Sequence, residues 1–141
     1  MTIYSLNNIK SLQQTYSIVN RRRIIGRNSK PTYELLDSLK FELSNGDVIT
    51  IPKGFIWDLS SVPRFLWSLF APDGDYEIAS LIHDYLYINK TYSRKFADKE
   101  MLIWSRVLNS TSNKWSIRNL DNWVRYYAVR GFGWIVWNKR K

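Results

Sequence analysis

Residues 73 to 108 read DGDYEIASLIHDYLYINKTYSRKFADKEMLIWSRVL, and their pattern predicts two helices joined by a short connection. The first helix begins after the Asp-Gly-Asp of residues 73–75, because small polar residues cap helix N-termini, and it includes LIHDYLY, residues 81–87. Residues 89–92 form the connection, and Ser93 is placed to cap the second helix, RKFADKEMLIWSRVL. A connection this short should fold the second helix back against the first as an antiparallel pair.

Strand patterns precede the helix pair. The run KFELSNGDVITIPKGF, residues 40–55, predicts a β-hairpin, because Asn45 and Gly46 supply two positive-φ positions between strand-like flanks. Residues 1–31 show weak periodicity and contain the basic run RRRIIGR, so we interpret them as a basic arm or a poorly packed strand.

A third helix is expected from about Ile117 to Arg130, where the apolar residues keep helical spacing. The predicted fold class is therefore α+β: an N-terminal β-hairpin or small antiparallel sheet followed by three helices, of which the first two are the antiparallel pair. The predicted organisation is an N-terminal basic arm over residues 1–31 and a single α+β domain over residues 32–141.

The composition limits the class of protein. The chain has 141 residues, no cysteine and a net charge of +9, with 21 Lys and Arg against 12 Asp and Glu. The absence of cysteine excludes disulfides and thiolate metal sites, and with no signal peptide it indicates a reducing compartment or a particle assembled in one. No apolar run approaches the ~20 residues of a membrane span. Basic charge with many aromatic residues is typical of nucleic-acid binders and of proteins on anionic membranes, but also of ordinary solvated surfaces.

The only histidine of the chain, His83, is followed at once by Asp84 on the first predicted helix. Helical residues three and four apart share a face, so Ser80, His83, Asp84 and Tyr87 lie on one side, away from the most apolar stripe. That side is where the wall of a cleft could be. The competing interpretation is a histidine at the edge of the core beside a solvated aspartate.

Asp98 lies in the first turns of the second helix, which should face the first. A carboxylate there can accept the imidazole N–H and fix the tautomer, as a general base requires. The alternative is an exposed i,i+4 ion pair between Asp98 and Arg94 without a functional role. In the loop GFIWDLSSVP, residues 54–63, Asp58 and Ser61 are further site candidates, although Asp58 could simply cap its own turn.

Four sequence blocks carry a family resemblance. In order, GFIWDLSSVPR, LIHDYLY, SRKFADKEML and YYAVRGFGWIVW resemble the phage and prophage family known as domain of unknown function 1353, over roughly residues 33–137. The resemblance implies a viral or prophage origin and brings no particular activity.

HDYLY on one helix and ADKEML on the next are similar to the His-Asp helix pair of the phospholipase A2 superfamily. In that superfamily the histidine deprotonates a water, the adjacent aspartate holds calcium, and the second-helix aspartate orients the histidine. The resemblance implies that His83 is the base, Asp84 a calcium ligand, Asp98 the orienting group and Tyr87 its support. The glycine-rich calcium loop of the superfamily has no clear counterpart, and APDGDYEIAS (71–80) offers mainly carboxylates as oxygen ligands.

Three functions follow from these patterns. The first is a hydrolase of ester or amide bonds, in lipid or cell wall, that uses His83 and Asp98 and a divalent cation such as calcium during host entry or lysis. The second is a non-enzymatic structural or adaptor protein of the virion, in which the same side chains form a buried polar network. The third, nucleic-acid binding, has no recognised motif to support it. The expected partners are virion proteins or the host envelope, and the expected location is the virion or the host cytoplasm.

Overall fold

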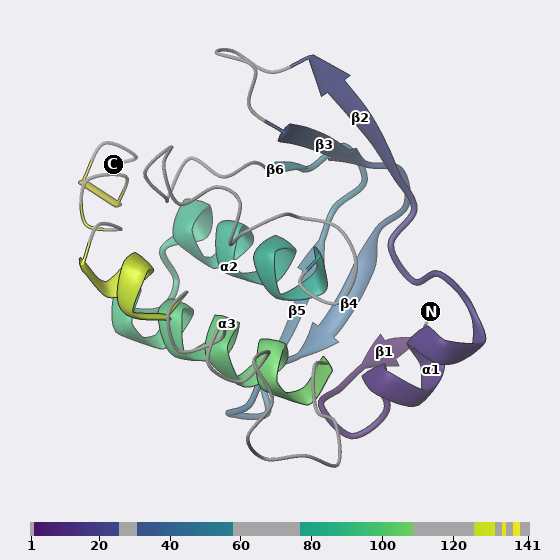
Figure 1. Cartoon of the computed structure of the whole chain (residues 1–141), viewed down its shortest axis with the longest axis horizontal. Coiled ribbons are helices and arrows are strands. Elements are labelled where there is room, and N and C mark those ends of the chain that lie inside the picture. The colour runs from purple at the N-terminus through teal and green to yellow at the C-terminus, as the bar shows by residue number, and fades with distance from the viewer. Residues whose placement is uncertain are drawn as a thin grey trace. The chain divides into compact units, whose positions relative to one another are not determined.

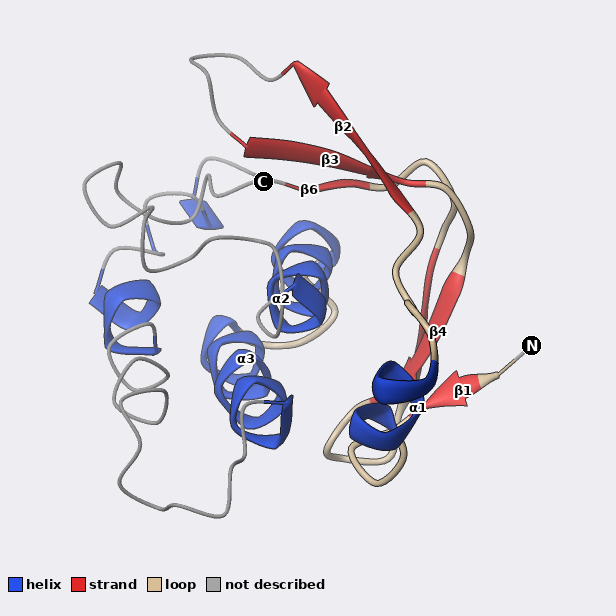
Figure 2. Cartoon of the chain, turned by 45° about the vertical axis from the view of Figure 1, so that its right-hand side comes forward, coloured by secondary structure: helices blue, strands red, loops and turns tan. Residues whose placement is uncertain are grey.

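The fold is that of a computed structural model of the whole chain, in which residues 2–25, 31–57, 77–108, 126–131, 134 and 137–138 are described (Figure 1). The chain divides into two compact units, Met1–Asp58 and Leu59–Lys141. The described strands all belong to the first unit, and the two longest described helices belong to the second (Figure 2).

The first unit contains two three-stranded sheets. One has the order β1-β4-β5, with β1 at Ile3–Tyr4, β4 at Leu39–Glu42 and β5 at Val48–Ile51. The other has the order β2-β3-β6, with β2 at Arg21–Ile25, β3 at Pro31–Leu35 and β6 at Ile56–Trp57. The helix α1, Ile9–Thr15, follows β1 and buries Ile9.

Alternation of apolar and polar residues explains the core of this unit. Along β4, Leu39 and Phe41 are buried, and along β5 Ile49 and Ile51 are buried, whereas the residues between them are more exposed. Successive strand residues point to opposite faces, so each strand contributes one apolar face.

The predicted hairpin is confirmed, because β4 and β5 pair antiparallel with Glu42 opposite Val48. Its turn differs from the prediction. Gly46 has a φ of 90°, but Asn45 is not among the residues with positive φ. The Gly46 N–H donates to Leu43 O and the Leu43 N–H donates to Asp47 O, so the loop is a three-residue turn with one glycine in the left-handed region.

The second unit contains the predicted helix pair. The helix α2 spans Glu77–Asn89 and α3 spans Arg94–Leu108, and the two run antiparallel side by side (Figures 1 and 2). Lys90, with a φ of 55°, ends α2, and its N–H donates to Leu86 O. The Ser93 hydroxyl accepts the Phe96 N–H at 3.1 Å, so the predicted cap of the second helix is confirmed.

The predicted architecture, one hairpin or small antiparallel sheet followed by three helices, is wrong. The strands form two sheets spread through the N-terminal half, and the first sheet is mixed because β1 pairs with β4 in parallel. Both β1 and β2 come from residues 1–31, which we interpreted as an arm or a poorly packed strand. A two-residue strand has no readable period. The arginine-rich β2 pairs with β3 in a register that places Arg22 opposite Glu34, where the two side chains form an ion pair.

The described residues test the predicted third helix only in part. Residues 126–131 are helical, and the rest of the predicted third helix lies outside the described residues. The division into an arm and a domain at residue 31 stays a prediction.

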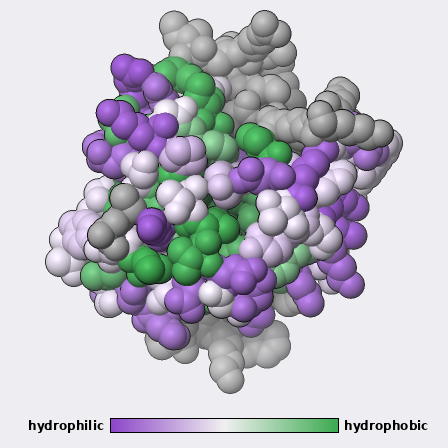
Figure 3. All heavy atoms as spheres, turned by 180° about the vertical axis from the view of Figure 1, so that it is seen from behind, coloured by the Kyte–Doolittle hydropathy of each residue, from purple (hydrophilic) through white to green (hydrophobic). Residues whose placement is uncertain are grey.

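No helix within the described ranges is long and apolar enough to cross a membrane. Seen from behind, the surface mixes hydrophilic and hydrophobic residues (Figure 3).

Candidate functional site

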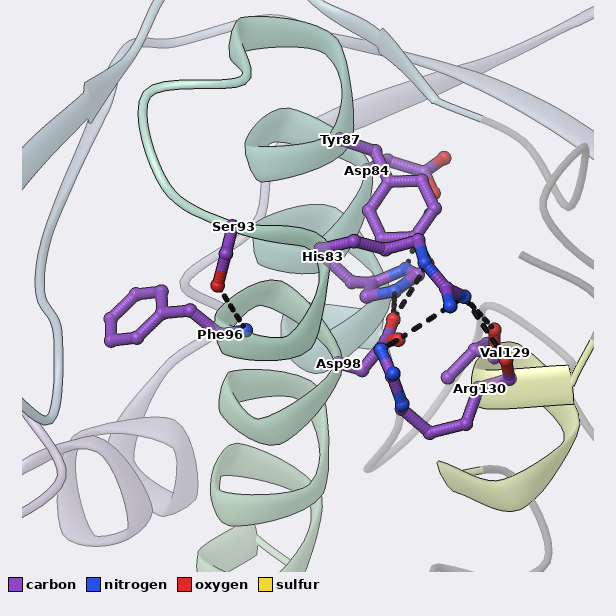
Figure 4. Close-up of polar contacts among 9 residues, drawn as sticks. His83, Asp84, Tyr87, Ser93, Phe96, Asp98, Val129 and Arg130 are labelled. Carbon is purple, nitrogen blue, oxygen red and sulfur yellow. Dashed lines mark hydrogen bonds and ion pairs between the residues drawn. The ribbon is translucent and has the colours of Figure 1, made fainter. Parts of the chain in front are cut away.

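The helix pair brings His83 and Asp98 together. The imidazole Nε2 of His83, on α2, lies 2.8 Å from Oδ1 of Asp98, on α3 (Figure 4). The predicted hydrogen bond between the two helices is therefore confirmed. An ionised carboxylate can only accept hydrogen bonds, so Nε2 carries the proton of this bond. The basic nitrogen of the neutral ring is then Nδ1.

Tyr87 supports the same carboxylate. Its hydroxyl donates to Asp98 Oδ1 at 2.7 Å, and its ring lies 4.2 Å from that of His83, one helical turn earlier on α2. Burial and the negative charge of Asp98 both raise the pKa of Tyr87 above its ordinary value. The hydroxyl therefore keeps its proton and stays a donor, and the predicted position of Tyr87 is confirmed.

Asp84 lies on the other side of the imidazole. Its Oδ1 is 3.9 Å from His83 Nδ1, beyond hydrogen-bond distance, so it acts on the ring through its charge. Burial by itself would lower the pKa of His83, but the carboxylates of Asp84 and Asp98 outweigh burial and raise the pKa above 6.5. A group that gives a proton to Nδ1 would lie next to Asp84.

The described residues do not fit a calcium ion. Within the described part of the chain, no group of three or more His, Asp or Glu side chains could hold a metal. Asp84 alone offers too few oxygens for calcium, which takes six to eight. The other expected donors, Asp73 and Asp75, lie outside the described residues, and we assign no step of a reaction to a metal.

The other predicted site residues divide into two groups. Ser80, which helical spacing places on the face of His83 as a supporting site residue, donates its hydroxyl to Glu77 O at 2.8 Å within its own helix, and its support of the site stays a prediction. The loop candidates Asp58 and Ser61 lie outside the described residues, and their part in a site stays a prediction.

Burial distinguishes this network from the predicted cleft wall. His83 is 2% exposed and Asp98 is 0% exposed, and both faces of α2 are buried. The alternative of an exposed pair between Asp98 and Arg94 is only half right: Arg94 Nη1 lies 3.9 Å from Asp98 Oδ2 as an i,i+4 ion pair, but Asp98 is fully buried and not exposed. The apolar stripe of α2 predicted one buried face, but the opposite face, which contains His83 and Asp84, is also buried.

Asp98 has one further partner, Arg130, which no sequence pattern indicates. Its Nη1 donates to Asp98 Oδ2 at 3.0 Å, across 32 residues of the chain. Local periodicity relates neighbours along a helix and contains no information on such a distant pair. The sequence shows that residue 130 is basic, but it does not show that Asp98 is the partner of Arg130.

Comparison with known proteins identifies one family. The family model described as "Protein of unknown function (DUF1353)" matches residues 33–129, which include α2 and α3 completely. No curated protein sequence and no solved structure matches the chain significantly.

Proposed function

The chain belongs to the DUF1353 family, and on that premise we propose that it is a small phage-encoded hydrolase of ester or amide bonds in lipid or cell wall. One observation carries the proposal: His83 Nε2 is bonded to a buried carboxylate, which leaves Nδ1 as the basic nitrogen. The same arrangement of a His-Asp pair, an orienting aspartate and a supporting tyrosine is implied by the resemblance to phospholipase A2.

In the proposed reaction, Nδ1 of His83 accepts a proton from a water molecule while the water oxygen bonds to the carbonyl carbon of the substrate. The Nε2–H bond to Asp98 holds the ring in place throughout. The resulting imidazolium is stabilised by Asp84 and Asp98. When the bond to the leaving oxygen or nitrogen breaks, Nδ1 returns its proton to that atom.

The substrate class is tested by offering two polymers of different chemistry. Purified protein is incubated with phosphatidylglycerol vesicles and with bacterial peptidoglycan, and the release of fatty acid or of soluble fragments is measured. Hydrolysis of either one supports the proposal and names the bond. Hydrolysis of neither, by a protein that melts cooperatively, would contradict it.

The pH dependence should identify the base. Only neutral imidazole can accept a proton, and the pKa of His83 is raised, so the hydrolytic rate should increase with pH and reach half its maximum above pH 6.5. Asp84→Asn removes one of the charges that raise this pKa and should move the midpoint to lower pH. Lys99→Gln, at an exposed position of α3, is the control. A rate that does not increase with pH in the wild type, or a midpoint that Asp84→Asn leaves unchanged, would contradict the assignment of His83 as the base.

Calcium dependence remains a proposal, because the additional oxygen donors would have to come from residues outside the described ranges. If it is correct, chelation by EGTA should lower the rate by roughly 100-fold, since a metal typically contributes several kcal/mol to charge stabilisation. Added calcium should restore the rate in the wild type but not in Asp84→Asn. Full activity in EGTA would remove the metal from the proposal and leave His83 as the base.

Burial of the network favours a second candidate, a structural or adaptor protein of the virion. Buried, satisfied polar networks specify unique packing without any catalysis. In this case the protein should be detected in purified phage particles, bound to other virion proteins, and it should hydrolyse neither polymer.

Nucleic-acid binding by the basic run of β2 has weaker support. Arg22 pairs with Glu34, and the guanidinium of Arg21 lies 4.2 Å from the Tyr33 ring centroid. These arginines therefore interact within their own sheet. Their charge alone indicates no nucleic-acid site.

A further inference from the structure

Two basic side chains at the junction of α2 and α3 bind carbonyl groups of the C-terminal residues. Lys90, which follows α2, donates from Nζ to Trp137 O at 2.6 Å and lies 5.0 Å from the Trp137 ring centroid. Arg94, the first residue of α3, donates from Nη1 to Val129 O at 3.2 Å and to Arg130 O at 3.0 Å. Arg94 therefore binds two carbonyl groups of the helical residues 126–131.

These anchors place Arg130 beside the buried carboxylate. Asp98 Oδ1 accepts from His83 and Tyr87, while Oδ2 accepts from Arg130 Nη1 at 3.0 Å (Figure 4). A carboxylate bonded through one oxygen alone can still rotate about its bond to Cβ. A charged donor on the second oxygen restrains this rotation, and such bonds are about twice as strong as neutral ones.

We propose that Arg130 is a positioning residue, which fixes the Asp98 carboxylate so that Oδ1 faces His83 Nε2, and that the C-terminal residues thereby complete the His-Asp pair. Arg130 bonds the orienting group and not the imidazole, so it acts through Asp98. The consequence for catalysis rests on the proposed function, but the placement itself does not. The roles taken over from phospholipase A2 include no such arginine.

The chain has a single histidine, which allows the placement to be measured directly. Protein labelled with ¹⁵N-histidine gives one imidazole in an NMR spectrum, and the exchange of its Nε2 proton with water reports the bond to Asp98. In Arg130→Met this exchange should be faster by at least about tenfold, the scale expected when a hydrogen bond to a charged group weakens. Arg130→Lys keeps the charge and should restore part of the protection.

Two more variants keep the experiment decisive. Arg106→Met removes an exposed arginine from α3 and should leave the exchange unchanged. Arg94→Met removes the anchor of residues 129 and 130 together with the more distant ion pair, 3.9 Å, to Asp98 Oδ2, and should accelerate the exchange less than Arg130→Met does. If Arg130→Met does not fold, the exchange rate of Arg130→Lys against the wild type decides the proposal.

The outcome that overturns the proposal is specific. Arg130 would be a structural anchor only if its folded variants lowered the melting temperature but left the Nε2 proton as protected as in the wild type. This readout needs no substrate. Faster exchange together with absent hydrolysis would therefore keep the placement and reject the hydrolase, whereas unchanged exchange with intact hydrolysis would do the reverse.

Discussion

His83→Gln should lower the hydrolytic rate by roughly 100- to 10,000-fold, the range in which a general base contributes. Glutamine is chosen because its amide N–H can still donate to Asp98 Oδ1, so the buried carboxylate keeps three donors. What glutamine lacks is a basic nitrogen at the position of Nδ1. The rate loss therefore measures the base and not the loss of packing.

The measurement compares initial rates and melting temperatures of the wild type, His83→Gln and Ile88→Gln. Ile88 is an exposed position of the same helix, so its variant controls for glutamine in α2. We expect both variants to remain folded and only His83→Gln to lose activity. If His83→Gln keeps the wild-type rate on a substrate that the protein hydrolyses, the imidazole is architectural and the proposed mechanism is wrong.

Asp98→Ala should have the largest effect on stability. The carboxylate is fully buried and accepts from His83, Tyr87 and Arg130. Its removal leaves two buried donors without an acceptor, and breaking a buried pair typically costs about 3 to 5 kcal/mol. The side chain of Arg130 is 31% exposed, so water can solvate it and its share of the cost is smaller.

For a chain of this length, the expected loss corresponds to a fall in melting temperature of roughly 10 to 15 °C. Asp98→Asn keeps an acceptor oxygen and should fall between Asp98→Ala and the wild type. Lys99→Ala, the exposed neighbour on α3, is the control, measured in the same urea and thermal unfolding experiments. Equal melting of Asp98→Ala and Lys99→Ala would show that the network contributes little to the fold.

The helix pair and the core of the site could be predicted from the sequence because their causes are local. Helical spacing and the Ser93 cap define α3, and the short connection after α2 returns the chain so that Asp98 meets His83. Tyr87 follows from the same rule, since residues one turn apart share a helix face. The β4–β5 hairpin was equally local, although the predicted positive φ of Asn45 was wrong.

Tertiary structure alone decided the strand pairing, the burial of Asp98 and the contact of Asp98 with Arg130. The parallel pairing of β1 with β4 and the second sheet around β3 depend on β1 and β6, which have two residues each, and on the arginine-rich β2, and these patterns are too short or too basic to indicate strands. The complete burial of Asp98 is a property of the folded chain, and the partner of its Oδ2, Arg130, lies 32 residues later in the sequence. Local propensity specifies which element a segment forms, whereas burial and distant hydrogen bonds arise only when several elements exclude water together. For this reason, the residues of the His-Asp pair were readable in the sequence, but the side chain that holds Asp98 from the other side was not.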